Sequence, residues 1–150
     1  MNLKEKINLD LKEAMKSGDK TRLMVVRSIR ALILEFEKSG SNKELTPEIE
    51  ISMLNTAAKK RKDSIEQFRN AGRNDLADAE EAELKILMEY LPKQLDESEI
   101  KSEVEKIANQ IGAKTKADFS KLMPLVMKEL KGKADGKVVR STVENFLGEN

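Results

Sequence analysis

Arg61-Lys-Asp-Ser-Ile-Glu-Gln-Phe-Arg-Asn-Ala-Gly-Arg-Asn-Asp-Leu76 is the stretch that decides the fold. Its first part carries Ile65 and Phe68 at helical spacing. The glycine that follows, Gly72, is the residue type most often found just past a helix end, and Asn74 is a residue type that caps the next helix. The stretch therefore predicts two helices that are joined by a tight turn at Gly72 and run antiparallel.

The register of this hairpin pairs side chains that lie equally far from Gly72. Arg61 lies eleven residues before the glycine, and Glu83 lies eleven residues after it. Arg61 falls near the centre of the apolar arc of its helix, and Glu80 and Glu83 fall on the apolar side of the next one. We therefore expect a partly buried structural ion pair between Arg61 and Glu83 or, failing that, Glu80. The alternative is a metal site or an acid–base pair at the two glutamates, but neither a histidine nor an Asp-rich loop accompanies them.

The same pattern extends along the whole chain. All seven glycines fall between or just outside segments of helical periodicity, and no β-branched run alternates with period two. We predict an all-α fold with a four-helix N-terminal domain, residues 1–91, and a three-helix C-terminal domain, residues 92–150. The boundary is expected at the five residues Leu91-Pro-Lys-Gln-Leu95. The last three helices should follow caps at Asp96, Thr115 and Asp135, and Pro124 predicts a kink or a short break at Met123.

The composition excludes several kinds of chemistry. The 150 residues include no cysteine and no histidine, which removes thiolate nucleophiles, the most usual general base and the commonest transition-metal ligands. No apolar run of about 18 residues occurs, and the N-terminus lacks the apolar core of a signal peptide. We therefore expect a cytoplasmic protein without membrane contact, catalytic residues, metal or cofactor.

Positive charge is concentrated near the C-terminus, although the net charge of the chain is only +1. Residues 114–140 hold eight basic and three acidic side chains, a local charge of +5. Gly132 and Gly136 can adopt a positive φ or let a partner's backbone approach, and Asp135 can cap a helix whose first turn binds an anion. The candidate RNA-binding residues are Lys121, Lys128, Lys131, Gly132, Lys133, Gly136, Lys137 and Arg140. The alternative is an ordinary turn between two helices with solvated lysines.

The aromatic residues limit how a nucleic acid could be recognised. The four phenylalanines fall on predicted apolar faces and tryptophan is absent, so no exposed platform for stacking unpaired bases is expected. A nucleic acid would be bound through its phosphates and its shape, without recognition of a DNA sequence.

Three segments, Arg61–Leu76, Glu81-Ala-Glu83 and Tyr90–Leu95, carry a resemblance to the YqeY-like family, together with the opening amphipathic helix and the C-terminal tail. The resemblance covers essentially the whole chain. This family shares a domain with the B subunit of glutamine-dependent aminoacyl-tRNA amidotransferases, in which helices of the domain contact the tRNA.

The resemblance implies an accessory module that binds tRNA or another structured RNA through the basic C-terminal surface. One alternative is a helical adaptor with a protein partner. Another is a component of a glutamine-dependent carbon–nitrogen ligase, the amidotransferase complex. Because the chain has neither a Walker-type phosphate loop nor a Ser/Lys amidase signature, we expect no catalysis from this polypeptide alone.

Overall fold

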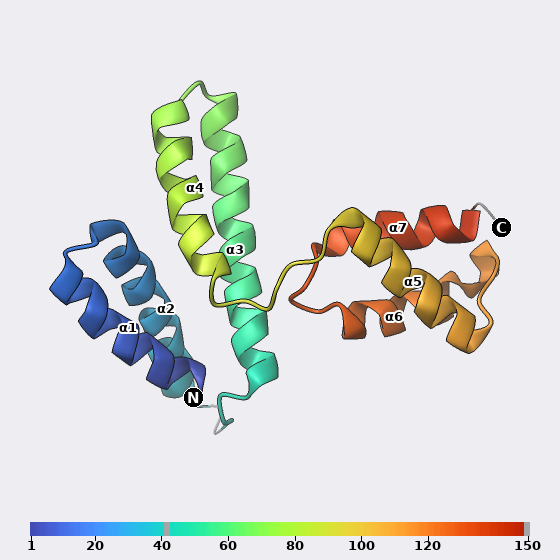
Figure 1. The fold of residues 1–150 in the computed structure, drawn as a ribbon, viewed down its shortest axis with the longest axis horizontal. Helices are drawn as coiled ribbons and strands as arrows, with labels where there is room; N and C mark the ends of the chain where they lie inside the picture. Colours follow the sequence, from blue (N-terminus) through green and yellow to red (C-terminus); the bar gives the residue numbers. More distant parts are fainter. Residues whose placement is uncertain (41–42, 149–150) are drawn as a thin grey trace. The chain divides into compact units, whose positions relative to one another are not determined.

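The computed structural model describes residues 1–40 and 43–148, and all regular structure in these ranges is helical (Figure 1). The prediction of an all-α fold is confirmed. The elements are α1 (Leu3–Ser17), α2 (Lys20–Lys38), α3 (Pro47–Asn70), α4 (Asn74–Met88), α5 (Glu97–Ile111), the short 3₁₀ helix η1 (Lys116–Asp118), α6 (Phe119–Glu129) and α7 (Gly136–Gly148).

Local signals fix where several helices begin and end. Asp96 and Glu99 form the predicted capping box of α5, in which Asp96 Oδ1 accepts a hydrogen bond from the Glu99 N–H at 2.8 Å. Asp19 caps α2 by accepting from the Arg22 N–H at 3.0 Å. Gly72 forms the turn between α3 and α4 with φ at +73°, a conformation that is strained for other residues. The hairpin predicted from this turn is therefore present.

Two predicted caps are wrong in detail. α4 begins at Asn74 itself, so Asn74 does not cap it; its side-chain oxygen instead accepts from Arg69 Nη1 at 3.3 Å. Thr115 and Asp118 pair as in the predicted capping box, since Asp118 accepts from the backbone N–H groups of Lys114 and Thr115, but this cap starts η1, which leads directly into α6.

A kink or a short break is expected at Met123, and the break does not occur. α6 runs through Pro124 without interruption, although proline removes one backbone hydrogen bond. Leu122 and Val126, which lie on either side of the proline along the helix, are both fully buried. Their packing outweighs the local cost of the proline.

The chain divides into two compact units, residues 1–91 and 92–150. In the first unit α1 packs along α2, α3 packs along α4, and α2 contacts α4 (Figure 1). In the second unit α5, α6 and α7 pack against one another. The assignment of these units as a four-helix domain and a three-helix domain remains a prediction. The buried core of the first unit includes Ile7, Val26, Ile29, Ile33, Leu54 and Leu87, and that of the second includes Val104, Leu122, Val126, Val139 and Val143.

The connection between the two cores is shorter than the five residues expected. Leu91 is buried in the core of the first unit. Gln94 Nε2 donates to the Gly132 carbonyl at 2.6 Å, and the Leu95 N–H donates to the Lys133 carbonyl at 2.8 Å, so both residues are held in the second unit. Only Pro92 and Lys93 therefore lie between the two cores.

Candidate functional site

The turn after α6 and the first half of α7 carry four of the predicted cations. Lys131, Lys133, Lys137 and Arg140 are all exposed. Asp135 caps α7 as predicted, since its Oδ1 accepts from the Lys137 N–H at 2.8 Å. The cap fixes the backbone at the start of α7 and leaves the lysine side chains in solvent.

Arg140 differs from the lysines because it has partners within the unit. Its Nε lies 3.0 Å from Glu144 Oε1, and its guanidinium carbon lies 5.8 Å from the centre of the Phe119 ring. Part of its charge is therefore balanced by a carboxylate and an aromatic ring, and Arg140 is less available for a phosphate than the lysines are.

The two glycines of the predicted site have structural roles. Gly132 adopts a positive φ of 78°, but it is buried and its carbonyl accepts from Gln94, so a ligand cannot approach its backbone. Gly136 is the first residue of α7, and its φ is not in the left-handed region. A Cβ added there would lie 3.5 Å from Met127 Cε, an ordinary contact. The expectation that every glycine separates helices is therefore wrong for Gly136, and also for Gly148, which ends α7.

Lys121 and Lys128 lie away from the other predicted cations. Lys128 lines a groove between α5 and α6, together with Lys106 on α5. Lys121 precedes Lys128 by seven residues and so lies on the same side of α6. Lys137, by contrast, lines a groove between α5 and α7. The structure therefore separates the predicted set into an α6 group and a group on the turn and α7.

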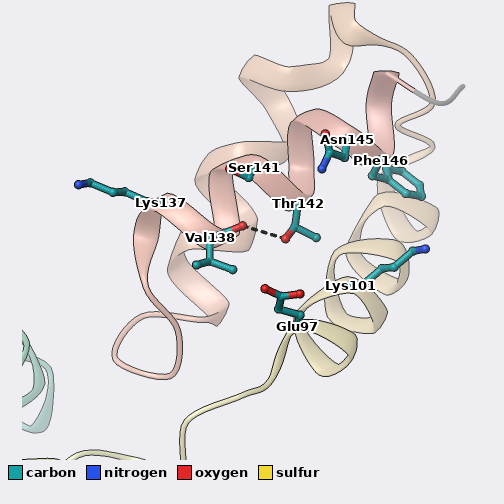
Figure 2. A pocket seen from close by; sticks show the side chains of 8 residues that line it. All are labelled: Glu97, Lys101, Lys137, Val138, Ser141, Thr142, Asn145 and Phe146. Atoms are coloured by element: carbon teal, nitrogen blue, oxygen red, sulfur yellow. Dashed lines mark hydrogen bonds between the residues drawn. The ribbon is translucent and has the colours of Figure 1, made fainter.

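The groove between α5 and α7 has a volume of about 440 Å³ (Figure 2). Its walls are formed by Glu97, Lys101, Lys137, Val138, Ser141, Thr142, Asn145 and Phe146. The Thr142 hydroxyl donates to the Val138 carbonyl at 2.8 Å, which holds this side chain against its own helix. Sequence reasoning missed Glu97 and Lys101; their four-residue spacing places both on one edge of α5, but nothing in the sequence showed that this edge faces α7.

The ion pair predicted from the hairpin register is present in the first unit. Arg61 Nη1 lies 2.5 Å from Glu83 Oε2 and 3.3 Å from Glu80 Oε2, and its Nη2 lies 3.4 Å from Ser28 Oγ. The exposed fraction is 17% for the Arg61 side chain and 12% for that of Glu83. This arrangement is typical of an internal ion pair that holds α4 against α3. Within the described residues no three acidic side chains gather closely enough to hold a metal ion.

A second polar cluster of the first unit was missed by sequence reasoning. Asp10 is the one charged side chain that is buried in the described ranges. The Tyr90 hydroxyl donates to its Oδ2, and Lys6 Nζ lies 2.9 Å from its Oδ1. Burial by itself would raise the pKa of Asp10, but the hydrogen bonds from Tyr90 and Lys6 outweigh it and hold the pKa below its usual value. Burial and the neighbouring carboxylate raise the pKa of Tyr90.

One sequence signal could have found Asp10. Leu3, Ile7 and Ala14 form the buried face of α1, and residue 10 completes this three-and-four spacing. Met15, which the apolar pattern places on that face, is 59% exposed. An acidic residue at a buried helical position requires a partner, although the sequence does not say which one.

Comparison with known proteins decides the family. The family model described as Yqey-like protein matches residues 4–147. The chain belongs to the YqeY-like family. A relative in Pyrenophora tritici-repentis, named altered inheritance of mitochondria protein 41, mitochondrial, is 34% identical over 95% of this chain and 80% of its own length. A protein of the same name in Saccharomyces cerevisiae is 31% identical over 85% of this chain and 68% of its own. An uncharacterized protein of Schizosaccharomyces pombe is 37% identical over 61% of this chain and 73% of its own.

These names correct the expectation of a cytoplasmic protein. Relatives of this YqeY-like chain are named as mitochondrial proteins, which contradicts that prediction. The prediction relied on the lack of an apolar leader and of an apolar span, and neither criterion distinguishes one aqueous compartment from another. In the described ranges, no helix is long and apolar enough to cross a membrane.

Proposed function

We propose that this YqeY-like protein binds structured RNA, with tRNA as the first candidate, through the turn after α6 and the outer face of α7. One observation carries the proposal. In a chain of net charge +1, residues 114–140 carry a local charge of +5, and Lys131, Lys133 and Lys137 are exposed where α7 begins. Exposed lysines that are close in the chain give a phosphate-binding surface with little preference for sequence.

The surrounding contacts support this choice of surface. The turn is held by the hydrogen bonds from Gln94 and Leu95 and by the Asp135 cap. These lysines therefore project from a fixed backbone, which lowers the entropy lost when a ligand binds. The relationship to the amidotransferase B subunit, implied by the sequence resemblance, adds tRNA as the candidate RNA.

The test compares two variants that lose the same charge from different surfaces. In the turn variant, Lys131, Lys133 and Lys137 are replaced together by Gln. In the control variant, the exposed lysines of the α5–α6 side, Lys106, Lys121 and Lys128, are replaced together by Gln. Both variants should melt close to the wild type, because exposed charges contribute little to stability.

The binding of a labelled, folded tRNA is followed by fluorescence anisotropy at several salt concentrations. The turn variant should bind more weakly, and the slope of log K against log salt should flatten by ~0.7–0.9 for each phosphate that the variant no longer neutralises. The control variant should keep most of the wild-type affinity. Equal affinity of the turn variant and the wild type at low salt would contradict the proposal.

A protein partner is the second candidate, and one observation favours it. Ile111 and Leu125 are 42% and 41% exposed in the α5–α6 groove, beside the buried Ile107. Apolar side chains exposed in a groove are typical of surfaces that bind another protein. In this case, a protein that cross-links to the wild type should no longer cross-link to the Leu125→Ser variant. It should still cross-link to the turn variant.

A further inference from the structure

The groove between α5 and α7 holds polar side chains that have no interaction partner among the residues that the structure describes. In residues 1–40 and 43–148, no hydrogen bond or ion pair involves the side chains of Glu97, Lys101, Lys137, Ser141 or Asn145. All five are exposed and line the same groove (Figure 2). The groove therefore offers a carboxylate, an amide, a hydroxyl and two ammonium groups to one ligand.

Helical spacing arranges these groups in two rows. Lys137, Ser141 and Asn145 follow one another at intervals of four residues along one edge of α7, a length of about 12 Å. Glu97 and Lys101 form the facing edge of α5. Figure 2 shows the Glu97 carboxylate directed towards α7, near Val138 and Thr142, while the ammonium groups of Lys101 and Lys137 lie towards opposite ends of the groove.

This order of charges fits a sugar that has a phosphate on each side. A carboxylate accepts hydrogen bonds from the hydroxyls of a ribose, as acidic side chains do in dinucleotide-binding sites. Ammonium groups at the two ends offset the repulsion between that carboxylate and the phosphates. A volume of about 440 Å³ lies within the usual range for small-ligand sites.

We propose that this groove binds one ribonucleotide unit of an RNA chain, with Glu97 accepting a hydrogen bond from the ribose 2′-hydroxyl and Lys101 and Lys137 contacting the flanking phosphates. The proposal rests on the proposed RNA binding and adds a function to it, because a contact with the 2′-hydroxyl distinguishes RNA from DNA. Lys137 belongs both to this groove and to the turn surface, so the two contacts can be made by one strand.

The test uses a short unstructured RNA oligonucleotide and a DNA oligonucleotide of the same sequence with deoxyuridine in place of uridine. An unstructured strand removes the difference in helix shape between RNA and DNA. The wild type should prefer the RNA by roughly tenfold, the effect of one hydrogen bond to a charged group. Glu97→Ala should reduce this ratio towards one, and Glu97→Gln, which keeps an acceptor oxygen, should retain part of it.

Glu103→Ala is the matched control, because it removes the same charge from the same helix but lines the α5–α6 groove. It should leave the ratio unchanged. Equal wild-type affinity for the two strands, or equal ratios for Glu97→Ala and wild type, would overturn the assignment of Glu97 while leaving RNA binding intact. Failure of the wild type to bind either strand would overturn the proposal for this groove, whereas the proposed binding of structured RNA is decided separately by the measurement with folded tRNA.

A second measurement distinguishes a nucleotide within RNA from a free nucleotide. Adenosine monophosphate and its 2′-deoxy form are titrated into the wild-type protein, and backbone amide shifts of α5 and α7 are followed by NMR. If the amide shifts of Glu97 and Ser141 saturate at a much lower concentration of the ribonucleotide than of the RNA, the groove serves a free nucleotide. This result would contradict the proposal. Weaker binding of the monophosphate than of the RNA is the expected result.

Discussion

Replacement of Arg61 tests whether the ion pair between α3 and α4 stabilises the first unit. Arg61→Ala would leave Glu83, which is 12% exposed, and Glu80, which is 27% exposed, without their shared cation. Removing one partner of a buried pair costs about 3–5 kcal/mol. Because the Arg61 side chain retains 17% exposure and water can reach Glu80, we expect a smaller loss of about 2–4 kcal/mol.

The chain offers a probe that reports on this unit alone. Tyr90 is the single tyrosine, and there is no tryptophan, so tyrosine fluorescence during unfolding in urea follows residues 1–91. This matters because two units need not unfold together, and a probe that averages over both would not give a defined free energy. With a urea dependence of about 2 kcal/mol per molar, which is typical of small proteins, the expected loss lowers the midpoint by roughly 1–2 M.

Arg69→Ala is the control on the same hairpin. Arg69 lies 3.0 Å from Asp78 and 2.8 Å from Glu81, but its side chain is 38% exposed and its partners are more exposed still. Its loss should move the midpoint little, since exposed pairs contribute little to stability. If the midpoints of Arg61→Ala and Arg69→Ala coincide with that of the wild type, the ion pair does not stabilise the unit. The double variant with Glu83→Ala then measures the coupling directly: it should be less destabilised than the sum of the two single variants.

Three further predictions concern other parts of the chain. Tyr90→Phe removes a hydrogen bond that lowers the pKa of Asp10, so NMR titration of that carboxyl should show a higher pKa. A carboxyl whose pKa is lower in the folded protein than in the unfolded chain stabilises the fold at pH values above the unfolded pKa. This stabilisation is lost as the pH falls through the folded-state pKa, so the variant should lose less stability on acidification than the wild type does. Gly132→Ala should destabilise the second unit by about 1–2 kcal/mol because φ is +78°, whereas Gly136→Ala should be nearly neutral in thermal melts. Residues 92–150 alone should give a helical circular dichroism spectrum with a cooperative melt, and a featureless coil spectrum would show that the second unit depends on the first.

The sequence sufficed where the structure depends on neighbours along the chain. The capping box of Asp96 and Glu99 depends on residues three positions apart, and the Arg61–Glu83 pair follows from counting outward from one turn. Asp10 and Tyr90 are eighty residues apart, and their contact depends on how α1 meets the end of α4. No local pattern carries that information, because it is a consequence of tertiary packing.

The predicted RNA-binding residues show the same limit in another form. A helical wheel places Lys121 and Lys128 together on α6, and Lys137 and Arg140 together on α7, but it does not state which outer faces adjoin. In the structure each of these helices meets α5 along a different groove. Lys128 lies with Lys106 on one side of α5, and Lys137 lies with Glu97 and Lys101 on the other.

This separation changes what the charge of the C-terminal segment can do. A local charge of +5 suggests one continuous cationic surface, but α5 contributes glutamates to the grooves on both of its sides, Glu97 in one and Glu103 in the other. A phosphate that approaches Lys137 therefore meets a carboxylate in the same groove. A uniform polyanion gains little from this groove, whereas a ligand that alternates phosphates with hydroxyl donors satisfies both charges there. The placement of acidic side chains beside the lysines thus favours recognition of ribose together with phosphate over recognition of negative charge alone.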